Sequence, residues 1–139
     1  MSFWRWPDWR AHRVLRALGA GVIVAAIACL VRFLWVEPLA VGLLCQVEAP
    51  PWWCVLRRGL GAAFHLRVFG ALAIFLAIAA HVVPGREATL GFYALLAGVL
   101  AMVFYNALGG AVGLIGGLLA LVAVEYESGL PPSPVRLVR

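Results

Sequence analysis

Long apolar segments, separated by short polar stretches, constrain the fold of this chain more than any other feature. Of its 139 residues, 65% are hydrophobic and only 12% are charged, and the mean hydropathy is +1.00. All 11 basic residues are arginine, and six residues are acidic. A soluble domain of this length needs a far larger charged surface. The composition therefore predicts an all-α integral membrane protein that contacts the lipid bilayer, with no nucleic-acid partner.

Four segments have the composition of membrane helices, since about 20 apolar residues rising about 1.5 Å each cross a hydrocarbon core of about 30 Å. Without a break, residues 88–124 would form one helix of about 55 Å, which is too long for a bilayer. Asn106, Gly109 and Gly110 are turn residues, so we expect a tight hairpin there, with a broken helix as the alternative. We predict a four-transmembrane-helix bundle within residues 14–124, with helices at 14–36, 59–83, 88–105 and 110–124.

The distribution of arginine predicts the orientation of the chain. Seven of the 11 arginines precede the first segment or lie in its first turn, join the second to the third, or close the chain. Because basic residues favour the cytoplasmic side, we expect both termini in the cytoplasm of a bacterial-type inner membrane. Residues 1–13, with Trp4, Trp6 and Trp9, then form a cytoplasmic interfacial segment, and residues 125–139 a cytoplasmic proline-rich tail. The loop between helices 1 and 2 is extracytoplasmic, and its Arg57 and Arg58 oppose the charge bias.

Small residues recur at every fourth position in the first and last segments. This spacing lets helix backbones approach closely in lipid, where dispersion and weak Cα–H···O contacts drive association. The resulting faces serve either the protein's own bundle or a partner helix. The predicted packing residues are Ala17, Gly21, Ala25, Gly109, Gly113 and Gly117.

The loop after the first segment contains two of the three cysteines, Cys45 and Cys54. Both face the oxidising side in the expected topology, and Pro50 and Pro51 bend the chain between them. The spacing predicts a structural disulfide that stabilises the loop by roughly 3 kcal/mol. Cys29 is expected to be a free, small apolar residue inside the first helix.

The start of the second segment locally resembles the four-helix quinone-linked thiol oxidases. Those enzymes have an arginine four residues after the second cysteine of a reactive pair, and Arg58 stands at that distance from Cys54. The resemblance covers about 15 residues and implies thiol–quinone chemistry at Cys45 and Cys54. This chain departs from the family in two ways: eight residues separate its cysteines where the family has CxxC, and the third loop has no second pair.

Ionisable residues near the outer interface form a candidate site, because such groups are costly in a bilayer. Trp52, Trp53, Arg58 and His65 are predicted to line a lipid or quinone pocket. In the alternative interpretation, the arginines extend to the interface and pair with Glu37 or Glu48. His65 and His81 lie on the same segment, so we expect no intrinsic haem. We expect no metal ligands, no catalytic residues and no cofactor.

These features favour a non-catalytic accessory or assembly subunit of a larger bacterial-type inner-membrane complex. Its partners would be other membrane subunits or further copies of itself, contacted through small-residue helix faces and interfacial Trp and Arg. One alternative is a membrane thiol–quinone oxidoreductase that uses Cys45 and Cys54. A second alternative is a small oligomeric transporter, which rests on size and span count alone.

Overall fold

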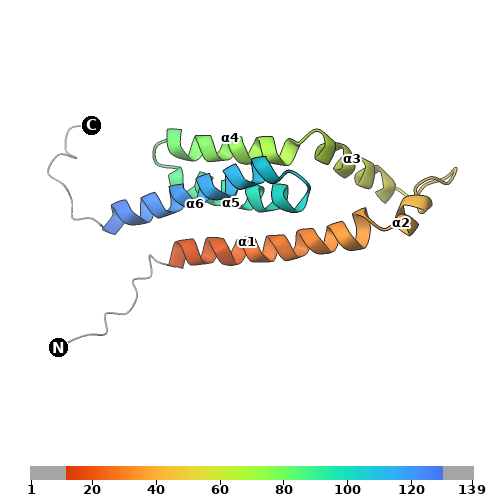
Figure 1. Ribbon diagram of the computed structural model, residues 1–139, viewed down its shortest axis with the longest axis horizontal. Helices are drawn as coiled ribbons and strands as arrows, with labels where there is room; N and C mark the ends of the chain where they lie inside the picture. Colours follow the sequence, from red (N-terminus) through yellow and green to blue (C-terminus); the bar gives the residue numbers. More distant parts are fainter. Residues whose placement is uncertain (1–11, 130–139) are drawn as a thin grey trace, which may run out of the picture.

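The computed structural model describes residues 12–129 as an all-helical chain (Figure 1). The interfacial segment with Trp4, Trp6 and Trp9, and the proline-rich part of the tail, lie outside the described residues. The elements are α1 (His12–Val31), the π-helical turn η1 (Arg32–Val36), α2 (Leu39–Leu44), α3 (Trp53–His65), α4 (Val68–Val82), α5 (Glu87–Val103) and α6 (Ala107–Gly129).

Length and composition identify two or three candidate membrane spans among these helices. Arg13–Val36 and Ala107–Glu127 are each long and apolar enough to cross a bilayer. The pair α3 and α4 becomes a third span if it is taken as one bent helix, and α5 is a shorter apolar helix. The chain is therefore a helical membrane protein, as its composition predicts.

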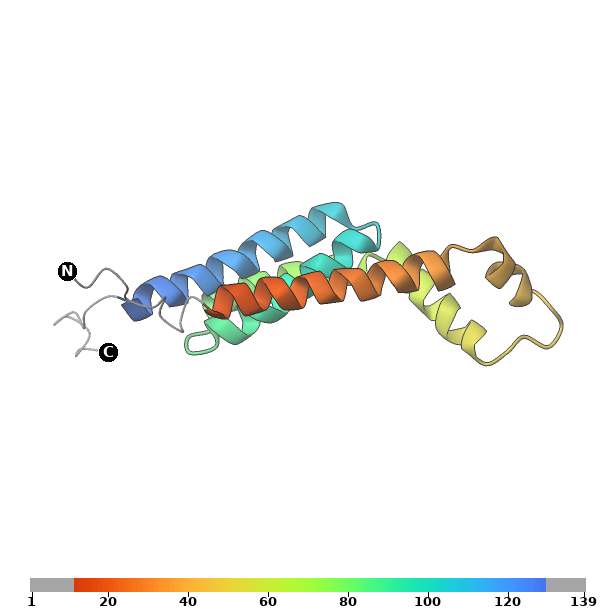
Figure 2. The same cartoon turned by 90° about the horizontal axis from the view of Figure 1, so that it is seen from below.

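Helices α4, α5 and α6 lie side by side, and α1 runs along them (Figures 1 and 2). The start of α1, the turn between α4 and α5, and the end of α6 share one end of the molecule, which we name the terminal end. At the opposite end, α2 and α3 extend beyond α4, α5 and α6, and α3 lies beside the end of the first helical segment. We name this the hairpin end.

The second predicted helix, residues 59–83, is two helices in the structure. It begins earlier, at Trp53, and bends by 59° between α3 and α4. The bend occurs at Arg67, whose backbone has the left-handed conformation with φ 55° and ψ 29°. A right-handed α-helix cannot continue through a residue in this conformation, so α3 ends and α4 begins in a new direction. The side-chain amide of Asn106 donates to the Arg67 carbonyl at 3.2 Å and holds this conformation.

The break between the third and fourth predicted helices exists, but it lies earlier than expected. Helix α5 ends at Val103 and α6 begins at Ala107, so Gly109 and Gly110 belong to the first turns of α6. Tyr105 provides the turn instead, with a φ of 63°. The prediction placed the turn between residues 106 and 110 because asparagine and paired glycines are frequent in turns.

The core joins α4, α5 and α6 through small residues. A Cβ atom added to Gly109 would lie 2.6 Å from the Cα of Gly70, and one added to Gly113 would lie 2.5 Å from the Cβ of Ala73. A Cβ atom on Gly117 would lie 2.5 Å from the carbonyl oxygen of Gly91. These glycines therefore lie where α6 approaches the backbones of α4 and α5 too closely for a side chain.

Helix α1 packs less closely than the other three. Ala17 is buried in a cluster with Leu95 and Leu121, and a Cβ atom on Gly21 would lie 3.2 Å from the Leu95 side chain. Ala25 lines an apolar pocket of about 230 Å³ between α1 and the bundle. Most of the apolar segment Arg13–Val36 is not buried against the other helices, and its Cys29 is free and half-buried.

Candidate functional site

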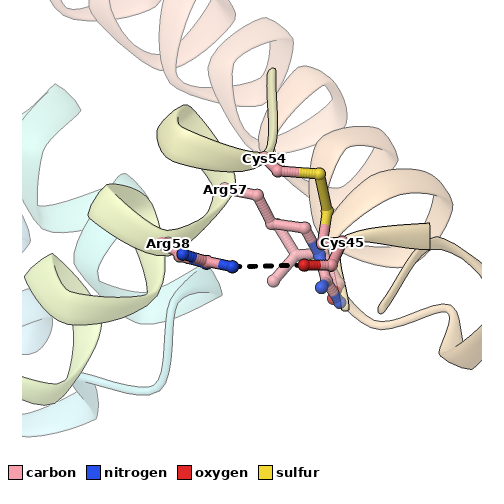
Figure 3. The surroundings of a disulfide bond; sticks show 5 residues. Cys45, Cys54, Arg57 and Arg58 are labelled. Atoms are coloured by element: carbon pink, nitrogen blue, oxygen red, sulfur yellow. Dashed lines mark hydrogen bonds between the residues drawn. A yellow bond between two sulfur atoms is a disulfide. The ribbon is translucent and has the colours of Figure 1, made fainter. Parts of the chain in front are cut away.

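The hairpin end is closed by a disulfide between Cys45 and Cys54, which the cysteine spacing predicts (Figure 3). Cys45 follows the last residue of α2, and Cys54 lies in the first turn of α3. Their Cα atoms are 5.5 Å apart, and both residues are buried. The bond therefore adds a second covalent link between two short helices that the loop of residues 46–52 also joins.

A cavity of about 290 Å³ lies beside this disulfide. One wall comes from the end of η1 and from α2, and the other from α3. On α3 the lining positions are i, i+3, i+4 and i+7, which share one face of a helix. The lining residues are Val36, Gly42, Cys45, Gln46, Cys54, Arg57, Arg58 and Gly61.

Two arginines of α3 extend toward Cys45 and bind backbone carbonyls of the facing wall (Figure 3). Arg57 donates from Nη2 to the carbonyl oxygen of Val36 at 2.7 Å. Arg58 donates from Nη2 to the carbonyl oxygen of Cys45 at 3.1 Å. The Nε atom of Arg57 is buried and finds no hydrogen-bond partner among residues 12–129. These bonds fix two positive charges at the cavity, in addition to holding α3 against η1 and α2.

Of the four residues predicted to form a pocket, only Arg58 lines the cavity. Trp52 is exposed, and Trp53 packs its ring 6.4 Å from the ring of Trp35. His65 shares the helix face of Arg58 but lies seven residues further along, about 10 Å away, and is exposed. The sequence interpretation left Arg57 out of the pocket, although its spacing of three residues from Cys54 places both on one helix face.

A second polar cluster at the hairpin end, which we name the Arg32 clamp, consists of Arg32, Glu37 and Tyr105. The Nε atom of Arg32 donates to the Glu37 carboxylate at 2.8 Å. The Tyr105 hydroxyl donates to the same carboxylate oxygen, and Arg32 Nη1 donates to the carbonyl of Val103. The guanidinium also lies 3.8 Å from the centroid of the Tyr105 ring. The clamp thus joins the end of the first span to the turn between α5 and α6.

The clamp changes the acidity of its two groups outside the helices. The hydrogen bonds from the Tyr105 hydroxyl and from Arg32 lower the pKa of Glu37 below its ordinary value. The same bond to Glu37 raises the pKa of the Tyr105 hydroxyl. The alternative interpretation of the sequence paired the arginines near the outer interface with Glu37 or Glu48, whereas in the structure the partner of Glu37 is Arg32, in the first segment.

The two clusters differ in the chemistry that they can support. The clamp is internally neutralised and bonded to backbone, so it serves to connect helices. The cavity combines a disulfide with two guanidinium groups, and no carboxylate is among its lining residues. Within residues 12–129, no group of three or more His, Cys, Asp or Glu side chains is placed to hold a metal ion. This chain matches no protein-family model, no curated protein and no solved structure.

Proposed function

We propose that this protein is a non-catalytic accessory or assembly subunit of a larger bacterial-type inner-membrane complex. One observation carries the proposal: the polar side chains that line the cavity, form the Arg32 clamp or face the bend are bonded to groups of the fold itself. Arg32, Arg57 and Arg58 all donate to backbone carbonyls, and Asn106 binds the carbonyl at the bend. The surfaces left over are apolar helix faces and a projecting, disulfide-closed hairpin, which suit contact with lipid and other subunits.

The proposal includes four spans, formed by α1, by α4 with α3 as its bent extension, by α5 and by α6. The terminal end supports this topology (Figures 1 and 2). In a bundle of four antiparallel spans, the start of the first span, the turn between the second and third spans and the end of the fourth span all lie on one side, as the start of α1, the α4–α5 turn and the end of α6 do here. The disulfide supports placing the hairpin end outside the cytoplasm, since such bonds persist in oxidising compartments. Both termini are then cytoplasmic, in agreement with the arginine bias.

Mild-detergent extraction tests the proposal directly. The full chain, of 14.9 kDa, should co-migrate with other membrane chains in fixed stoichiometry. Deleting the protein should reduce assembly of the same chains. Arg58→Ala and His65→Ala should leave that complex assembled and mostly active. A chain that migrates alone, and whose deletion leaves membrane complexes unchanged, would contradict an accessory role.

A second candidate function, a membrane thiol–quinone oxidoreductase, is favoured by the cavity that Cys45, Cys54, Arg57 and Arg58 line together. In that reaction the two thiols give two electrons and two protons to a quinone, which forms the disulfide and a quinol. Trapping thiols by rapid alkylation separates the two functions. In quinone-depleted membranes an oxidoreductase accumulates reduced Cys45 and Cys54, whereas an accessory subunit keeps the bond.

A further inference from the structure

We propose that the cavity beside the disulfide binds the phosphate group of an anionic phospholipid, at the non-cytoplasmic surface of the membrane that the chain spans. The site consists of the Arg57 and Arg58 guanidinium groups on α3 and the facing wall from Val36 to Cys45. The inference is independent of the partner complex, since it concerns a ligand of the isolated chain.

The charges around the cavity favour an anion. Two guanidinium groups line it without a carboxylate. Glu37, next to Val36, is engaged by Arg32 and Tyr105, and Glu48 of the adjacent loop is exposed and is not among the lining residues. Each of the two arginines uses one bond on a backbone carbonyl and retains further N–H donors. The buried Nε of Arg57 has no acceptor among the described residues. Paired arginines with free donors match the several acceptor oxygens of a phosphate group.

The position of the cavity favours a lipid as the source of that phosphate. Val36, whose carbonyl binds Arg57, is the last residue of the apolar span Arg13–Val36. The cavity therefore lies at the level where a span leaves the hydrocarbon and lipid headgroups begin. Trp35 and Trp53 pack together at the same level, as indole rings do at membrane interfaces.

The size of the cavity also suits a headgroup. Its volume of about 290 Å³ corresponds to about ten water molecules at their liquid density. This exceeds a single ion and falls far short of a whole phospholipid. The acyl chains would remain outside, against exposed apolar residues of η1 such as Phe33 and Leu34.

Native mass spectrometry of the full chain, released from nanodiscs of equal phosphatidylglycerol and phosphatidylcholine, tests the site. We expect the wild type to retain phosphatidylglycerol preferentially. Arg57→Gln and Arg58→Gln should each reduce this retention by about tenfold, because each removes charge-assisted bonds to the phosphate. Arg67→Gln is the matched control, since it removes one exposed arginine from the same end without altering the cavity lining. It should retain the lipid as the wild type does.

Two further measurements keep the result interpretable. Peptide mapping of the Cys45–Cys54 bond verifies that each variant is folded at the hairpin. Because Arg58 is exposed, Arg58→Gln tests the site even if Arg57→Gln unfolds the hairpin.

Competition with millimolar inorganic phosphate identifies the source of the bound phosphate group. Displacement of the lipid shows that the phosphate group suffices for binding, and persistence of the lipid shows that the rest of the lipid contributes. Either supports the site. Equal retention of the two lipids by the wild type, or an equal loss in Arg58→Gln and Arg67→Gln, would overturn it.

Discussion

Arg32 illustrates how a single charged residue is accommodated within a membrane segment. It lies four residues before the end of the apolar span Arg13–Val36, where an unpaired charge is costly. Its guanidinium is satisfied in three ways: by the Glu37 carboxylate, by the Val103 carbonyl and by the Tyr105 ring. Val103 and Tyr105 belong to the end of α5 and the following turn. Arg32, whose charge is costly within the span, therefore also connects the span to the other helices.

The clamp should make stability depend on pH with a definite sign. Because the folded pKa of Glu37 is lowered, its contribution is fully present above the unfolded pKa, near 4.5, and is lost as pH falls through the folded value. The raised pKa of Tyr105 means that its bond is also lost as pH rises through the folded tyrosine value. Between these limits we expect Glu37→Gln to have a lower Tm than the wild type.

Thermal unfolding in detergent across the acid range checks this expectation. The difference in Tm between wild type and Glu37→Gln should be constant at neutral pH and shrink in acid, as the wild-type carboxylate protonates. Glu48→Gln is the matched control, because Glu48 is an exposed acid of the adjacent loop. A Tm difference that does not vary with pH would mean that the charge of Glu37 is not what matters.

Helix α6 shows how packing in this protein depends on the absence of side chains. Its glycines meet Gly70 and Ala73 on α4 and Gly91 on α5, at distances that leave no room for a methyl group. In lipid such close approach replaces the hydrophobic effect as the source of helix association. The stripe predicted from the sequence thus serves contacts within the chain, which is one of the two uses considered for it.

Gly113→Ala should destabilise the protein, whereas Gly19→Ala should not. Both residues lie inside helices, so alanine brings both the same helix-propensity gain of up to about 1 kcal/mol. At Gly113 the added Cβ would lie 2.5 Å from the Ala73 Cβ, and the overpacking costs about 1–3 kcal/mol. At Gly19 no atom lies within 4 Å of the added Cβ. Thermal unfolding of both variants in detergent gives the comparison, and equal Tm values would disprove close packing along α6.

The stability of the α2–α3 hairpin depends on the disulfide between Cys45 and Cys54. Peptide mapping without reductant should find Cys45 linked to Cys54 and Cys29 free. Replacing Cys45 and Cys54 together by serine removes a bond across a sequence separation of 9, worth about 2.5 kcal/mol in the chain-entropy model.

The loss should be local, because α3 extends beyond α5 and α6 (Figure 2). Hydrogen exchange should accelerate in residues 45–60 and remain unchanged in α5. Exchange that rises equally in both would show that the hairpin and the bundle unfold together.

At the scale of the whole molecule, the separation of the two ends is the feature open to direct measurement. The loop of residues 46–52 lies at the hairpin end, and the turn between α4 and α5 lies at the terminal end (Figures 1 and 2). If these ends lie on opposite sides of a bilayer, a reagent that cannot cross the membrane distinguishes them.

Single cysteines introduced in a Cys29→Ala background provide this test. Glu48→Cys should react with an impermeant maleimide added outside intact cells, since the positive-inside rule places the loop there. Pro84→Cys, in the α4–α5 turn, should react only after the membrane is opened. Reversed labelling would invert the orientation, and labelling of both sites from outside would rule out four spans.

The sequence by itself determined the class of the protein, most of the helical segments and the disulfide. Apolar runs predict membrane helices because the bilayer requires internally bonded backbone, which is a local demand on each segment. The segment predicted at 14–36 corresponds to α1 with η1, and the break near Asn106 is present. Cys45 and Cys54 are close in sequence, so the short chain between them keeps the two sulfur atoms near each other and favours their pairing.

Only the tertiary structure decided the bend at Arg67, the residues of the cavity and the partner of Glu37. The bend depends on Asn106, which is 39 positions from Arg67, and the clamp joins Glu37 to Tyr105 across 68 positions. The cavity forms where α3 folds back against Val36. Contacts over such separations leave no periodic pattern in the sequence, because they depend on how whole helices are oriented and not on the local run of residues.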